Sequence, residues 1–327
     1  MQSAQLSRQF HSRGAAAIML AVAALYVALT GGYAAEPLRA VGRGFGLPGA
    51  EALHLSPMWQ TVASVAANLA VMALMVATNR AYNVLRSMSW LEVGLFALMQ
   101  AAVPRGVTML GSGVLMCLAV ALCTFLILGC YDAPERTRTV FLTFLILSAG
   151  MAVEYAFAVY IIVFGLMLAQ MRILSGRTAA AALMGIATVW ILLLGSGAVS
   201  PGDLRLPAPA GPPAHIGAHS GLYPLCVAAA GALLLVMALG ANVMKTIAYN
   251  ARARAYNGAL TVLALVTVVA MALDWGDMAA YLPLLNLCAA YQITHYFVNH
   301  RYDRQYIAVL AVAGIYVALA IWRLMLG

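Results

Sequence analysis

Apolar stretches separated by short polar or Pro- and Gly-rich breaks follow one another along the whole of this 327-residue chain. Their lengths match the roughly 20 residues that an α-helix needs to cross a bilayer, and they do not alternate as barrel strands do. The pattern predicts an all-α, polytopic membrane protein, with residues 1–327 in a single integral membrane domain. The eleven predicted spans are 15–33, 58–78, 88–103, 107–130, 139–153, 155–171, 178–199, 222–245, 258–273, 278–299 and 306–326.

The stretch 139–171 is ambiguous, because it fits either one long helix or a hairpin of two short helices that turns near Gly150 and Glu154. One helix of about 33 residues would be about 50 Å long. With a hairpin and a cytoplasmic N-terminus, 13 of the 18 Lys and Arg residues face the cytoplasm, whereas with one helix only 8 do. Because cytoplasmic loops are enriched in Lys and Arg, we predict the hairpin, a cytoplasmic N-terminus and a periplasmic C-terminus.

Composition supports a membrane protein and argues against several functions. Hydrophobic residues make up 64% of the chain and charged residues 9%, whereas soluble domains carry about a quarter charged residues. The basic cytoplasmic loops account for the net charge of +8, so no nucleic-acid partner is expected. The five Cys residues lie in apolar runs without metal-ligand spacing and are predicted to be small core residues. ATP-binding, dinucleotide-binding, zinc-protease and serine-hydrolase motifs are absent, so neither a cofactor nor a metal is expected.

The tetrapeptide RAYN occurs twice, at 80–83 and at 254–257. Both copies are predicted at the cytoplasmic end of an inward-running helix, namely the second and the eighth span. A Tyr-Asp pair follows each copy two spans later, at Tyr131 and at Tyr302. Two interpretations are open. The matches arise by chance, or they mark a parallel internal duplication with repeats 14–153 and 178–326 and an extra helix at 155–171.

The candidate chemistry lies on the predicted periplasmic side. Carboxylates and arginines at a membrane surface can bind a phosphorylated lipid headgroup and supply a general base. Glu36 and Glu51 are the candidate catalytic bases. The candidate substrate-binding residues are Arg39, Arg43, His54, Glu154, Arg205, His215 and His219, and Asp203, Asp274 and Asp277 are predicted on the same side. Alternatively, these are ordinary polar residues of surface loops.

Four candidate polar residues lie within the predicted spans. Glu92 follows the cytoplasmic end of its span by about one turn, so it is either functional or held near the interface by snorkelling or protonation. Tyr291, His295 and Asn299 are spaced i, i+4 and i+8 in the tenth span and therefore share one stripe of that helix. This stripe either faces a wet cavity or joins helices through hydrogen bonds.

Three segments carry a family resemblance: NRAYNVLRSMSW, YDAPERTRTVFLTFLILSAGMAVEYAFAVYIIVFGLMLAQMRI and AYLPLLNLCAAYQITHYF. On these segments the chain resembles an uncharacterised family of Bacteroidota inner-membrane proteins with domain of unknown function 6427, which implies no established activity. The middle segment is also distantly similar to the GT-C membrane glycosyltransferases, which have a short hairpin like 150–171 and then a basic turn like 172–177. That resemblance implies a catalytic carboxylate in the first outer loop, at Glu36 or Glu51, although the acidic pair usual in GT-C enzymes is absent.

Three functions fit these observations. The GT-C resemblance favours handling of a polyprenyl-phosphate-linked sugar in envelope glycan synthesis in the bacterial inner membrane, with Arg39, Arg43 and Arg205 holding phosphate. The duplication instead favours a small-solute or lipid carrier, or a flippase, built from two like-oriented halves. A non-catalytic subunit of an envelope assembly would explain the missing motifs. Membrane lipids are the expected partners, together with a polyprenyl-phosphate-linked sugar or other envelope proteins.

Overall fold

The computed structural model describes residues 12–30, 44, 45, 47–49, 55–87, 89–204, 219–299 and 305–326. In these residues the chain forms twelve α-helices and two short 3-10 helices, η2 (Pro201–Asp203) and η3 (Trp275–Asp277). The α-helices are α2 (Arg13–Thr30), α3 (Pro57–Tyr82), α4 (Leu91–Ala101), α5 (Pro104–Thr108), α6 (Ser112–Leu128), α7 (Thr137–Val153), α8 (Phe157–Gln170), α9 (Gly176–Gly195), α10 (His219–Thr246), α11 (Ala251–Leu273), α12 (Met278–Asn299) and α13 (Gln305–Leu326). The prediction of an all-α protein is confirmed. Ten of the predicted spans overlap one helix each, and the span 107–130 overlaps both α5 and α6.

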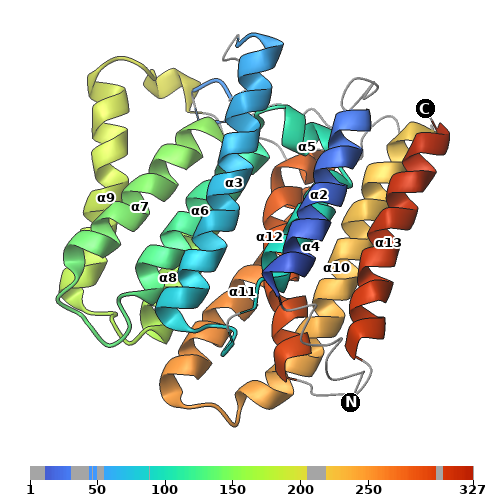
Figure 1. Ribbon diagram of the computed structural model, residues 1–327. Coiled ribbons are helices and arrows are strands. Elements are labelled where there is room, and N and C mark those ends of the chain that lie inside the picture. The colour runs from blue at the N-terminus through green and yellow to red at the C-terminus, as the bar shows by residue number, and fades with distance from the viewer. Residues whose placement is uncertain are drawn as a thin grey trace.

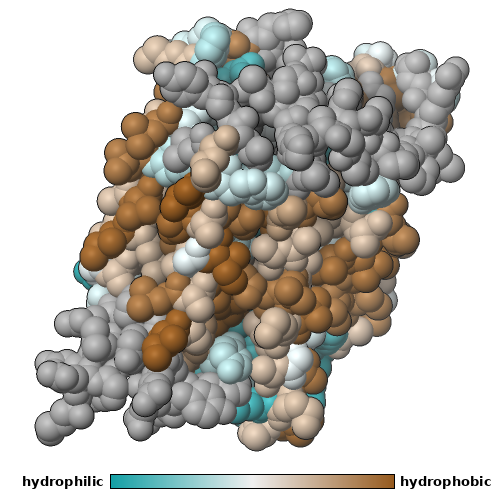
Figure 2. Space-filling view, turned by 90° about the vertical axis from the view of Figure 1, so that its right-hand side faces the viewer, coloured by the Kyte–Doolittle hydropathy of each residue, from teal (hydrophilic) through white to brown (hydrophobic). Residues whose placement is uncertain are grey.

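The bundle has the length and the surface of a membrane protein. Its main helices run side by side and alternate in direction (Figure 1). Five of them are long and apolar enough to cross a bilayer: α2, α3, α9, α11 and the Tyr223–Thr246 part of α10. Helices α4, α6, α7 and α8 and the Ile307–Arg323 part of α13 are shorter but also apolar. Figure 2 shows a broad hydrophobic band with hydrophilic residues above and below it. The lengths of these helices and the hydrophobic band are those of a multi-pass membrane protein.

The predicted hairpin is present as the pair α7 and α8. The chain leaves α7 at Glu154, whose backbone is extended with φ −145° and ψ 116°, and α8 begins at Phe157. The two helices pack against each other because Gly150 has no side chain. A Cβ on Gly150 would lie 2.4 Å from the ring of Phe157, closer than any real contact allows. A single helix across 139–171 is thus excluded.

Helices α12 and α4 form the centre of the bundle. Eighteen of the 22 residues of α12 are buried, and it packs against α4, α6, α10 and α11. All 11 residues of α4 are buried, and α2 and α12 both pack on it. At 1.5 Å per residue α4 is only about 16 Å long, about half the thickness of the hydrocarbon core. Because no face of α4 is exposed, its length does not have to match the bilayer.

The second RAYN copy lies elsewhere than predicted. The copy at 80–83 ends α3. The copy at 254–257, expected at the end of the eighth span, lies in the first turns of α11 instead. The cause is Asn250, whose side chain caps α11 by accepting a hydrogen bond from the Ala253 N–H at 2.9 Å. This cap starts the helix before the apolar run begins.

The two RAYN copies nevertheless meet in the fold. The rings of Tyr82 and Tyr256 form a T-shaped pair with centroids 5.8 Å apart. Tyr256 also packs edge-on against Tyr131, the first residue of a Tyr-Asp pair, at 5.9 Å. Such aromatic pairs contribute about 0.5–1.5 kcal/mol beyond their buried area. The repeated residues therefore help to join α3, α11 and the turn after α6.

Positive charge is concentrated at one end of the bundle, which is the lower end in Figure 1 and is called the basic end below. This is the end at which α3, α6, α8, α10 and α12 finish, and the opposite end is called the far end. The described basic residues at the basic end are Arg13, Arg80, Arg86, Arg136, Arg138, Arg172, Arg177, Lys245, Arg252 and Arg254. Only Arg105 and Arg323, among the described Lys and Arg residues, lie toward the far end.

Candidate functional site

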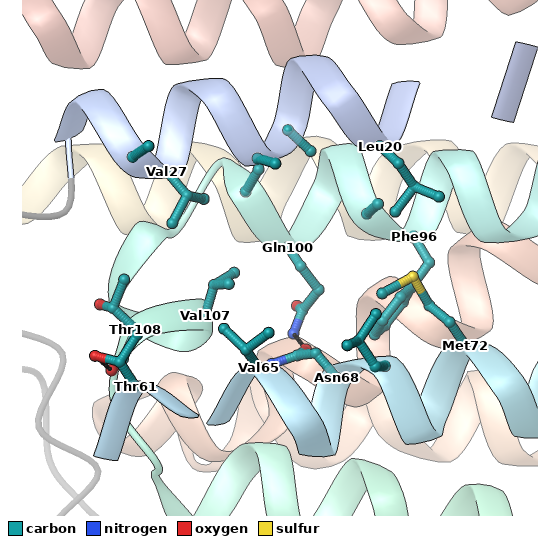
Figure 3. A pocket seen from close by; sticks show the side chains of 16 residues that line it. Leu20, Val27, Thr61, Val65, Asn68, Met72, Phe96, Gln100, Val107 and Thr108 are labelled. Carbon is teal, nitrogen blue, oxygen red and sulfur yellow. Dashed lines mark hydrogen bonds between the residues drawn. The ribbon is translucent and has the colours of Figure 1, made fainter. Parts of the chain in front are cut away.

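A pocket of about 500 Å³ lies between α2 and α3, with α4 and α5 behind it (Figure 3). Its wall is mostly aliphatic, and the polar residues Thr61 and Thr108 lie at its end nearest α5. The pocket opens on the side of the bundle, since its lining residues Val65 and Leu69 are 37% and 55% exposed. The residues that line it are Leu20, Ala23, Ala24, Val27, Ala28, Thr61, Val65, Asn68, Leu69, Met72, Phe96, Ala97, Gln100, Ala101, Val107 and Thr108.

Two amide side chains lie at the pocket and point toward each other, Asn68 from α3 and Gln100 from α4 (Figure 3). The Gln100 Nε2 donates to Asn68 Oδ1 at 2.9 Å, and the Asn286 Nδ2 of α12 donates to Gln100 Oε1 at 2.7 Å. The Asn68 Nδ2 in turn donates to the carbonyl oxygens of Ser64 and Gly106. We call Asn68, Gln100 and Asn286 the amide chain. It connects the pocket to the central helix.

Helix α5 holds the far end of the pocket in place through its carbonyl groups. The hydroxyl of Ser64 lies 3.4 Å from the carbonyl oxygen of Gly106 and 3.2 Å from that of Met109. The hydroxyl of Thr61 donates to the carbonyl oxygen of Thr108 at 3.0 Å. Because α5 is only five residues long, most of its backbone carbonyls have no partner within the helix. The polar side chains of α3 supply such partners.

Glu92 is fully buried in the first turn of α4, near the basic end. Its carboxylate lies near the amide of Asn79 and within electrostatic range of the Tyr291 hydroxyl, but neither oxygen makes a hydrogen bond within the described residues. The Glu92 side chain is 0% exposed, so its carboxylate does not reach the membrane surface by snorkelling. Burying an ionised carboxylate costs several kcal/mol, whereas a helix N-terminus contributes about 0.3–1 kcal/mol and at most about 2 kcal/mol. The cost of burying the charged carboxylate is therefore larger than the stabilisation that the helix N-terminus provides.

Two cations at the N-terminal end of α4 contact the aromatic ring of Trp90, the residue before this helix. The guanidinium groups of Arg13 and Arg80 lie over the ring of Trp90, at 5.2 and 5.5 Å from its centroid. The Asn79 side chain also makes two hydrogen bonds with the turn before α4. Its Nδ2 donates to the Ser87 carbonyl and its Oδ1 accepts from the Leu85 N–H, both at 3.0 Å.

The predicted stripe of α12 contacts three separate parts of the chain. The Tyr291 hydroxyl donates to the carbonyl oxygen of Met75 in α3 at 3.1 Å. The His295 ring packs edge-on against Tyr249, in the turn after α10, with centroids 6.0 Å apart. The carbonyl oxygen of Asn299 accepts from Lys245 Nζ at 2.9 Å. In the described structure the stripe therefore joins α12 to its neighbours.

Three carboxylates gather at the far end around Tyr281. Glu154, Asp274 and Asp277 are 0%, 6% and 4% exposed. The Tyr281 hydroxyl lies 3.4 Å from Asp274 Oδ2 and within electrostatic range of the other two carboxylates. These residues come from the α7–α8 turn and from the α11–α12 turn. The sequence placed all three on one side of the membrane but gave no sign that they would cluster.

Most of the predicted outer-face residues lie outside the described residues: Glu36, Arg39, Arg43, Glu51, His54, Arg205 and His215. His219 is the first residue of α10, and only its backbone is described. Four of the five Cys residues, Cys117, Cys123, Cys130 and Cys288, are buried, as predicted for core residues. Sequence reasoning missed Asn68 and Gln100, although an amide inside an apolar run was a usable signal.

Comparison of the chain with protein-family models, with curated proteins and with solved structures gives no match.

Proposed function

We propose that this protein is a multi-pass protein of the bacterial inner membrane that binds the hydrocarbon chain of a lipid-linked substrate in the pocket between α2 and α3. The observation that carries the proposal is the position of the pocket, which is lined by aliphatic side chains and opens on the apolar flank of the bundle. Its volume of about 500 Å³ falls in the range of small-molecule sites.

A lipid chain gains no hydrophobic energy by moving from the bilayer into an apolar pocket, because both surroundings are apolar. Selectivity must therefore come from shape and from polar groups. The pocket has Thr61 and Thr108 toward the far end and the amides of Asn68 and Gln100 deeper in. A single chain with its headgroup at the far end fits this order of apolar and polar groups.

The substrate is proposed to be a polyprenyl-phosphate-linked sugar, as the GT-C resemblance implies, with the phosphate and the sugar as its headgroup. In that proposal Glu36 or Glu51 is the base, and Arg39, Arg43 and Arg205 hold phosphate. The buried carboxylates Glu154, Asp274 and Asp277 add to the acidic character of the same face.

The proposal places the basic end in the cytoplasm, since Lys and Arg are enriched in cytoplasmic loops. Two exposed positions test this, Glu135 at the basic end and Ser200 at the far end. In spheroplasts, a membrane-impermeant maleimide should label a Ser200→Cys variant and not a Glu135→Cys variant. Labelling of Glu135→Cys alone would show that the topology is the opposite of the one proposed.

Two tryptophan variants on one helix test the pocket. Ala24 and Ala21 are both exposed on α2, but only Ala24 lines the pocket. In nanodiscs containing a photoactivatable polyprenyl phosphate, Ala24→Trp should reduce crosslinking several-fold, while Ala21→Trp should leave it unchanged. Equal crosslinking of the two variants would show that the pocket is not the binding site.

A lipid carrier or flippase is the second candidate, and one observation favours it. Glu92 is a buried carboxylate within an apolar helix, and such residues are characteristic of ion and proton pathways in transporters. Movement of a fluorescent lipid across liposome membranes, with and without the protein, distinguishes a carrier from a protein that only binds.

A further inference from the structure

The structure contains a buried carboxylate that binding of a lipid chain does not use. Glu92 has no exposed surface, and neither of its oxygens makes a hydrogen bond within the described residues. It lies in the first turn of α4, a helix whose residues are all buried. The same side chain is therefore cut off both from water and from the headgroup region.

We infer that Glu92 is a proton-binding site inside the membrane, which holds its proton at neutral pH and can exchange it toward the basic end. A carboxylate removed from water is stabilised in its charged form only by a cation or by several donors. Around Glu92 the structure offers one amide, that of Asn79, and the start of one helix. A bound proton removes the charge and the need for a partner.

Among the described residues, no cation makes a hydrogen bond with the Glu92 carboxylate. Helix α4 packs against α2, α3, α5, α12 and α13. At the end of α4 where Glu92 lies, the titratable or charged side chains of these helices and of the preceding turn are Arg13, Arg80, Tyr82, Arg86, Tyr291 and His295. Those at mid-height or at the far end are Tyr26, Tyr281, Cys288, Tyr316 and Arg323, and the backbone of Arg105 lies in α5 at the far end.

The cations at the basic end each make a contact away from the carboxylate. Arg13 and Arg80 lie over Trp90, and Arg86 lies 4.5 Å from the centroid of the Tyr249 ring. Tyr249 packs in turn against His295, which is four residues from Tyr291 on the same stripe of α12. The contacts of Arg86, Tyr249 and His295 thus connect the stripe of α12 that carries Tyr291 with the surface of the basic end.

Infrared spectroscopy of the protein in lipid vesicles tests the inference, because a protonated carboxyl group has a C=O stretch that a carboxylate lacks. At neutral pH the difference spectrum between the wild type and Glu92→Gln should show one protonated carboxyl group. Glu135→Gln, which changes an exposed carboxylate at the same end, should give no such difference. A wild-type spectrum that matches Glu92→Gln in the carboxyl region would overturn the inference.

Thermal unfolding gives a second, independent measurement. Glutamine imitates a neutral carboxyl group, so Glu92→Gln should unfold at the wild-type temperature in mild acid and at a higher temperature than the wild type as the pH is raised. Failure of the neutral isostere to fold at any pH would contradict the inference. Ala24→Trp should leave the infrared band in place, so the pocket and the proton site can fail separately.

Discussion

The amide chain allows a quantitative test of how the centre of the bundle is held together. Replacing Gln100 with Met keeps the length of the side chain but leaves two buried groups unpaired, Asn68 Oδ1 and Asn286 Nδ2. An unsatisfied buried polar group costs about 1–3 kcal/mol, and interhelical hydrogen bonds in membranes average about 0.6 kcal/mol with a maximum of about 1.7 kcal/mol. We therefore expect Gln100→Met to lower the free energy of unfolding by about 1–3 kcal/mol.

The double variant makes this prediction sharper. Asn286→Leu leaves one group unpaired, Gln100 Oε1, and removes Asn286 Oδ1, which is buried without a hydrogen-bond partner among the described residues. Gln100→Met with Asn286→Leu leaves only Asn68 Oδ1 unpaired. The double variant should therefore be more stable than Gln100→Met alone. Unfolding free energies measured by steric trapping in bicelles give the comparison. A double variant that is no more stable than Gln100→Met would refute the hydrogen bonds assigned to the amide chain.

Two glycine positions give further predictions. Gly150→Ala should destabilise the α7–α8 hairpin by about 1–3 kcal/mol, because its Cβ would lie 2.4 Å from the Phe157 ring, whereas Gly165→Ala in α8, with open space around it, should be neutral or slightly stabilising in the same thermal unfolding assay. Gly185→Ala should cost at least as much as Gly150→Ala, because its Cβ would lie 2.5 Å from the backbone oxygen of Phe141, which cannot rotate away. A melting temperature for Gly185→Ala equal to that of Gly165→Ala would show that α7 and α9 do not approach so closely.

The positions of the helices could be predicted from the sequence wherever hydropathy and charge agree. The hairpin is the clearest case, because the distribution of Lys and Arg separated two topologies that hydropathy alone could not. Helix ends were less predictable. The start of α11 depends on the side chain of Asn250, and the separation of α4 from α5 coincides with Pro104, since the residue before a proline avoids helical geometry.

The candidate site was much harder to predict than the fold. A pocket lined by Leu, Val, Ala and Met has the same composition as a surface that faces lipid, so composition does not reveal it. The pairing of Gln100 with Asn286 joins residues 186 positions apart, a relation that hydropathy patterns do not contain. The burial of Glu92 also depends on tertiary packing, because its place in the first turn of α4 fits an exposed residue equally well.

The burial of α4 has a consequence for how the protein is made. During synthesis α4 leaves the ribosome long before α12, yet α12 supplies the side chain that pairs with Gln100. Until α12 is inserted, α4 is a short helix with a carboxylate and with an amide oxygen, Gln100 Oε1, that lacks its donor. We therefore expect it to stay beside the translocon or an insertase during this time. A chain truncated after α9 should therefore be recognised by membrane proteases, even though it contains three of the five long apolar helices, α2, α3 and α9.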